Sequence, residues 1–147
     1  MNSTRRVLLV DDEPDILATI GKYLELEGFE VVKAVDGEQA VAIATDGAQL
    51  IDVVILDLML PKQSGLQVCE ALRRHQRSAG IPIILYTGKG QDDVVASLGT
   101  DNTLLRQWGA NAYVSKLESA EGLVRQIRTL LNAPAPQPRP AAEERGP

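Results

Sequence analysis

Short apolar stretches rich in Val, Ile and Leu alternate with longer amphipathic stretches along most of this chain. Buried parallel strands have this continuous apolar character, whereas helices repeat their apolar residues every three or four positions. The pattern predicts strands at 6–10, 29–35, 53–56, 83–87 and 112–114, and helices at 14–26, 38–45, 66–76 and from 120 onward. Strand and helix alternate, so we expect an α/β fold whose five-stranded parallel sheet carries helices on both faces.

Four of the expected strands end on polar side chains. Asp11 and Asp12 follow the first strand, Asp57 follows the third, Thr87 ends the fourth and Lys116 comes just after the fifth. Ligands of open α/β sheets bind outside the carboxyl ends of the strands, and those ends share one edge in a parallel sheet. The sequence therefore predicts a single rim that holds three carboxylates, one hydroxyl and one ammonium.

Carboxylates gathered at one rim repel each other, by roughly 4 kcal/mol per pair at 4 Å and an effective dielectric near 20. A hard divalent cation offsets this repulsion. Oxygen donors without His or Cys nearby favour Mg²⁺, or Mn²⁺, over Zn²⁺, and the one histidine, His75, belongs to a helix away from the rim. One carboxylate beside such a cation is a plausible acceptor for a phosphoryl group, with the lysine and the hydroxyl neutralising its oxygens.

The motifs at these strand ends resemble the receiver domain of two-component response regulators, the CheY-like family, from about residue 5 to 132. The similarity rests on four segments in the family's order, Leu-Val-Asp-Asp-Glu-Pro at 9–14, Leu-Asp-Leu-Met-Leu-Pro at 56–61 followed by Gly65, Tyr-Thr-Gly at 86–88 and Tyr-Val-Ser-Lys at 113–116. The resemblance implies a flavodoxin-like sandwich of five βα units with strand order 2-1-3-4-5.

The resemblance also implies roles at the matching positions. Asp57 would accept a phosphoryl group from a sensor histidine kinase or a histidine phosphotransfer protein, and Thr87 and Lys116 would bind its oxygens. Asp11 and Asp12 would hold Mg²⁺, with Asp12, Asp57 and the backbone carbonyl of Met59 as its direct ligands. Tyr113 would move with Thr87 when the domain switches between two conformations. Such a protein would be a regulatory switch that catalyses only its own phosphorylation and slow dephosphorylation.

Two features depart from the family pattern. Leu117 follows Lys116 where the family usually has a proline, often after a cis peptide bond, and a cis bond before a non-proline residue costs roughly 3 kcal/mol. The stretch from 88 to 112 is also longer than in the family, which suggests a lengthened or split fourth helix. It contains Leu104, Leu105 and Trp108, candidates for an output surface that would bind a downstream protein together with the fifth strand and fifth helix.

Alternative functions stay open. A receiver-like docking module without phosphorylation would explain Leu117 and the altered fourth helix, although such a module has no reason to keep repelling carboxylates. A haloacid-dehalogenase-type phosphatase needs a second Asp two residues after its nucleophile, where this chain has Met59. A flavodoxin-like electron carrier needs a phosphate-binding loop after the first strand, and three consecutive acidic residues occupy that place.

Composition and charge further limit the class of protein and its domain organisation. The chain has 147 residues, of which 44% are hydrophobic, and a formal charge of −5, which argues against direct nucleic-acid binding. We expect one receiver domain at 1–132 and a Pro/Ala-rich disordered tail or linker at 133–147. Arg73, Arg74 and Arg77 suggest a solvated basic helix face. With no membrane span, no signal peptide and a single cysteine, Cys69, a cytoplasmic protein without an internal disulfide is expected.

Overall fold

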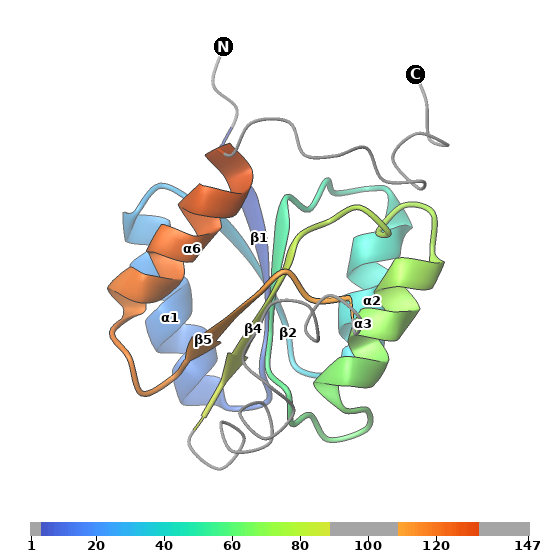
Figure 1. Cartoon of the computed structure of the whole chain (residues 1–147), viewed down its shortest axis with the longest axis horizontal. Helices are drawn as coiled ribbons and strands as arrows, with labels where there is room; N and C mark the ends of the chain where they lie inside the picture. Colours follow the sequence, from blue (N-terminus) through green and yellow to red (C-terminus); the bar gives the residue numbers. More distant parts are fainter. Residues whose placement is uncertain (1–3, 89–108, 133–147) are drawn as a thin grey trace.

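Five parallel strands form one sheet at the centre of the molecule (Figure 1). The computed structural model describes residues 4–88 and 109–132. The strands are β1 (Arg6–Val10), β2 (Glu30–Ala34), β3 (Val53–Leu56), β4 (Ile83–Thr87) and β5 (Ala112–Ser115). Their order across the sheet is β2-β1-β3-β4-β5, and every neighbouring pair is parallel. The predicted fold class and strand order are confirmed.

Helices cover both faces of this sheet. Helices α1 (Pro14–Leu26) and α6 (Ala120–Asn132) lie together on one face, and α2 (Gly37–Asp46) and α3 (Gly65–Arg74) lie on the other (Figure 1). The sheet residues alternate between the two sides, as the period of a strand requires. In β1, for example, Leu8 and Val10 face α2 and α3, whereas Val7 and Leu9 face α1 and α6.

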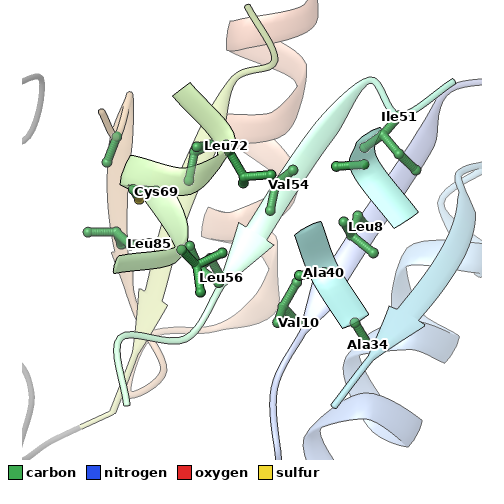
Figure 2. Packing of buried hydrophobic residues seen from close by; sticks show 14 of the residues in the cluster. Leu8, Val10, Ala34, Ala40, Ile51, Val54, Leu56, Cys69, Leu72 and Leu85 are labelled. Carbon is green, nitrogen blue, oxygen red and sulfur yellow. The ribbon is translucent and has the colours of Figure 1, made fainter. Parts of the chain in front are cut away.

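Each side of the sheet has its own hydrophobic core. Figure 2 shows the core under α2 and α3, in which Cys69 and Leu72 of α3 pack towards Val54, Leu56 and Leu85. Cys69 is completely buried, and burial raises the pKa of its thiol to about 12, so it remains neutral. The lone cysteine is thus a core residue, as its apolar neighbours in the sequence predict.

Local sequence signals set several helix boundaries. Pro14 occupies the first turn of α1, where its missing N–H costs nothing. Asp36 caps α2, and α3 begins with a capping box in which Ser64 and Gln67 exchange side-chain hydrogen bonds. The helix expected at 66–76 begins one residue earlier and ends at Arg74, because His75 has an extended backbone with φ −92° and ψ 132°.

Two predicted features lie outside the described residues. One is the lengthened or split fourth helix with Leu104, Leu105 and Trp108, and the other is the tail at 133–147. The boundary between domain and tail stays a prediction. Within the described ranges, none of the helices has the length and apolar character that crossing a bilayer requires.

Candidate functional site

The carboxyl ends of the strands bring the predicted site residues to one rim. Backbone hydrogen bonds continue past the ends of the strands: the N–H of Asp57 donates to the carbonyl of Val10 at 3.1 Å, and the N–H of Lys116 donates to the carbonyl of Thr87 at 2.7 Å. Asp11 is held in the same way by Ala34, at 3.1 Å. The backbone of each residue is therefore anchored to the sheet, which is more rigid than a loop.

Lys116 links the acidic residues of the rim. Its ammonium lies 2.8 Å from an Asp11 carboxylate oxygen and 3.1 Å from Asp57 Oδ2. A third carboxylate, Glu13, lies 3.3 Å from the same Nζ atom. The Lys116 side chain is only 10% exposed, and those of Asp11 and Asp57 are 1% exposed. These charges therefore interact with little screening by solvent.

At the rim, several carboxylates surround one ammonium group, that of Lys116. Burial raises the pKa of the Asp57 carboxyl, Lys116 opposes this shift and Asp11 adds to it. For Lys116, burial opposes the charged form, but the carboxylates of Asp11 and Asp57 outweigh it and raise the pKa of the ammonium. The pKa of Lys116 is raised because its ammonium contacts several carboxylates, whereas the pKa of Asp57 is raised mainly by burial. The carboxylates therefore hold the Lys116 ammonium strongly, whereas this one ammonium does not fully offset the effect of burial on Asp57.

The same carboxylates have the composition of a site for a hard cation. Side-chain oxygens of Asp11, Asp12, Glu13 and Asp57 all lie within 4.8 Å of one another. Asp12 and Glu13 are exposed, whereas Asp11 and Asp57 are buried, so the cluster opens to solvent on one side. Oxygen ligands with a surplus of negative charge suit Mg²⁺ or Mn²⁺.

Three other predicted residues differ in their position relative to this cluster. Met59 donates its backbone N–H to Asp57 Oδ1 at 3.2 Å, and its side chain is 58% exposed. Thr87 is completely buried at the end of β4. Tyr113 is partly buried against the core under α2 and α3, beside Leu85 in the strand register, and is not part of the carboxylate cluster.

The start of α3 is pressed against the backbone that carries Asp57. Gly65 donates its N–H to the carbonyl of Leu58 at 2.7 Å. A Cβ atom at Gly65 would lie 2.5 Å from the Asp57 carbonyl oxygen and 2.8 Å from the Leu58 Cα atom. Both are backbone atoms, which cannot move away without shifting the end of β3. This position therefore requires glycine for close approach.

We predict that Gly65→Ala lowers the free energy of unfolding by about 2 kcal/mol, because the extra methyl group overpacks this contact. The comparison is Gly122→Ala within α6, where the new Cβ would meet only a Glu118 oxygen, at 3.6 Å. That change should stabilise the protein by about 0.5 kcal/mol through helix propensity. Urea denaturation measures both. Equal stability of Gly65→Ala and the unmodified chain would show that the contact relaxes freely.

Two features of the rim were not predicted. The contact between Glu13 and Lys116 was missed, although three acidic residues in succession at 11–13 offered a signal for it. The sequence alone also does not show whether Leu117 disturbs the position of Lys116. All peptide bonds in the described part of the chain are trans, and the ammonium of Lys116 nevertheless reaches Asp57. The missing proline therefore does not prevent the contact.

Comparison with known proteins agrees with this geometry. Residues 7–128 match the model of the response regulator receiver domain. The chain is 38% identical over 127 residues to the DNA-binding dual master transcriptional regulator RpaA of Synechocystis, covering 86% of this chain and 48% of that protein. It thus spans about half the length of the regulators that it matches.

Solved structures show the same similarity. A response regulator receiver domain protein of Clostridium thermocellum superposes with a TM-score of 0.73 at 30% identity, covering 87% of this chain and 94% of the other. The response regulator TrrA of Thermotoga maritima, solved in complex with Mg²⁺ and BeF, gives a TM-score of 0.70 at 32% identity and covers 87% of this chain and all of its own. With its sheet order, its acidic rim and these matches, the chain belongs to the receiver domain family of two-component response regulators.

Proposed function

We propose that Asp57 accepts a phosphoryl group and that the domain acts as a phosphorylation-activated switch. The observation that carries the proposal is the Asp57 carboxylate itself, which is buried at the end of β3, lies 3.1 Å from the Lys116 ammonium and belongs to a four-carboxylate cluster. A plain structural core gains nothing from such a cluster, because its charges repel each other. Receiver domains are regulatory modules that work with histidine kinases, so the donor would be a histidine kinase or a histidine phosphotransfer protein.

Mg²⁺ is the proposed cofactor, and Mn²⁺ would substitute for it. Asp11, Asp12, Asp57 and the backbone carbonyl of Met59 would hold it, and the surplus negative charge of the carboxylates supports this assignment. The structure of the relative from Thermotoga maritima, solved as a complex with Mg²⁺ and BeF, supports it as well. When bound, the cation would neutralise charge on the incoming phosphoryl oxygens. Glu13 belongs to the same cluster and would raise its negative charge further.

The residues of the chain then have separate roles in the transfer. A carboxylate oxygen of Asp57 attacks phosphorus while the bond from phosphorus to the partner's histidine nitrogen breaks, and that nitrogen keeps the electron pair and takes up a proton. Lys116, now paired with Asp57 Oδ2, would pair with a phosphoryl oxygen instead. The Thr87 hydroxyl would donate to another. Burial of Asp57 and Lys116 keeps water from screening these charges.

The switch would use Thr87 at the end of β4 and Tyr113 in β5. Tyr113 is the register partner of Leu85, and Thr87 lies two residues after Leu85 in β4, so all three residues are on the same face of the sheet. Leu85 and Tyr113 both pack in the core under α2 and α3. A hydrogen bond from Thr87 to the phosphoryl group would favour one packing of Tyr113 over another, as a shift of population between two states. A downstream protein would bind the face made by the fourth helix, β5 and α6, including Leu104, Leu105 and Trp108.

The position of the domain in its pathway stays a prediction. RpaA is named as a DNA-binding regulator. For this acidic chain we propose protein partners, with no direct nucleic-acid contact by the receiver domain and a cytoplasmic location. The alternative, a docking module without phosphorylation, is suggested by Leu117 and by the altered fourth helix, which lies outside the described residues. The reach of Lys116 to Asp57 favours the switch instead.

Intact-protein mass spectrometry tests the proposal. Incubation with acetyl phosphate and Mg²⁺ should add the mass of one phosphoryl group, and chelation of the metal should prevent it. Asp57→Asn, which keeps the size of the side chain, should take no adduct. If the unmodified chain takes none, and beryllofluoride with Mg²⁺ also changes nothing, the docking module becomes the better interpretation.

A further inference from the structure

The loop after β5 determines where the Lys116 ammonium points. Three backbone hydrogen-bond donors in succession hold this loop. The N–H of Lys116 donates to the Thr87 carbonyl at 2.7 Å, that of Leu117 donates to the Ser115 hydroxyl at 3.0 Å and that of Glu118 donates to the Ser115 carbonyl at 3.1 Å. Ser115 thus accepts two of the three bonds, one of them through its side chain.

Leu117 contributes to this arrangement through its backbone and not through packing. Its side chain is 68% exposed, so burial of the isobutyl group does little to fix the loop. Its N–H, which a proline at this position would lack, finds the Ser115 oxygen. A hydroxyl that accepts from the amide two residues ahead closes a tight local turn. Lys116 is the central residue of that turn.

Ser115 itself is fixed by the sheet. It is the last residue of β5, only 8% exposed, and is the register partner of Thr87 in β4. Its hydroxyl therefore offers a fixed point to which the following loop is tied. The tie matters because Lys116 must place one ammonium between two buried carboxylates, at 2.8 and 3.1 Å.

We infer that Ser115 is a positioning residue for the proposed phosphoryl transfer: its hydroxyl accepts the Leu117 amide and so aims the Lys116 ammonium at Asp57. Ser115 acts through Lys116 and does not contact the phosphoryl group. The inference rests on the proposed function and adds to it a residue that takes over, in this chain, the restraint that a proline would supply by its ring.

Three substitutions test this role through the initial rate of adduct formation with acetyl phosphate at saturating Mg²⁺. Ser115→Ala removes the acceptor and should slow phosphorylation about fivefold, the loss expected for one hydrogen bond. Ser115→Thr keeps the hydroxyl and should restore the rate. Ser119→Ala, at an exposed serine just beyond the loop, is the matched control and should leave the rate unchanged.

A double-mutant cycle separates positioning from general destabilisation. In a Leu117→Pro background the amide no longer exists, so adding Ser115→Ala should have no further effect on the rate. Amide hydrogen exchange at Leu117 should become faster in Ser115→Ala and stay slow in Ser115→Thr.

The positioning role is overturned if Ser115→Ala is phosphorylated as fast as the unmodified chain, or if it slows both backgrounds equally. Unchanged exchange at Leu117 in Ser115→Ala would overturn it as well. An unmodified chain that takes no adduct would refute the proposed function and the positioning role together. A phosphorylated chain whose rate is insensitive to Ser115 would refute only the latter.

Discussion

Replacing Lys116 by Met should lower the free energy of unfolding by about 3 kcal/mol in metal-free solution at neutral pH. The substitution keeps most of the buried side-chain volume but leaves the carboxylates of Asp11 and Asp57, both 1% exposed, without their shared counter-ion. Added Mg²⁺ should stabilise the variant more than the unmodified chain, because the ammonium no longer repels the cation or occupies its ligands. Urea denaturation with and without Mg²⁺ measures both effects.

The loss of unfolding free energy in Lys116→Met should be smaller at acidic pH. Lys116 lowers the pKa of Asp57 against the larger effect of burial, so its removal raises that pKa further. A carboxyl whose pKa is raised in the folded state stabilises the fold at pH values below its ordinary pKa. This stabilisation is lost as the pH rises through the pKa of the folded state. Lys62→Met is the control. Lys62 is 61% exposed beside Glu38, so its removal should change stability by less than about 0.5 kcal/mol. Equal losses for the two variants would contradict the account of the rim.

Arg73→Met should cost about 3 kcal/mol and lower the melting temperature by roughly 10 °C. The guanidinium donates to the carbonyls of Ala79 at 2.9 Å, Ile81 at 2.7 Å and Gly109 at 2.9 Å, and to the Asn111 side-chain oxygen at 2.9 Å. These bonds tie the end of α3 to the turn before β4 and to the residues before β5. Methionine fills similar volume but leaves the carbonyls without that donor.

The neighbouring Arg74 is the matched control for this substitution. It is 75% exposed and pairs with Glu70 one helical turn earlier, at 2.9 Å. Exposed pairs of this kind contribute little, so Arg74→Met should change stability by less than about 0.5 kcal/mol. Thermal unfolding followed by circular dichroism distinguishes the two variants. If Arg73→Met melts together with Arg74→Met, the bonds made by Arg73 are worth no more than a surface ion pair.

The sheet and the rim could be predicted from the sequence because both follow from local patterns of apolar and polar residues. An apolar run that ends on Asp57 identifies a buried strand and also places its functional side chain at the carboxyl end. The same reasoning located Asp11, Thr87 and Lys116. Parallel connectivity then brings these ends together without any knowledge of distances, and the structure confirms the convergence of Asp11, Asp57 and Lys116.

The features that the sequence did not predict depend on long-range geometry. Arg73 belongs to a basic run that suggested a solvated helix face, and only the folded chain shows its guanidinium bound to carbonyls from two other segments. Glu13 reaches Lys116 across a separation of 103 positions. The bond from Leu117 to Ser115 is local, but a loop can satisfy its amides in several ways, and composition does not choose between them.

We propose that Asp57, and no other carboxylate of the cluster, receives the phosphoryl group. The most direct measurement is to phosphorylate the chain with acetyl phosphate and Mg²⁺, reduce the acyl phosphate with borohydride, and locate the resulting homoserine by tandem mass spectrometry. We expect homoserine at position 57 alone. Homoserine at Asp11 or Asp12, or a reduced product that persists in Asp57→Asn, would contradict it.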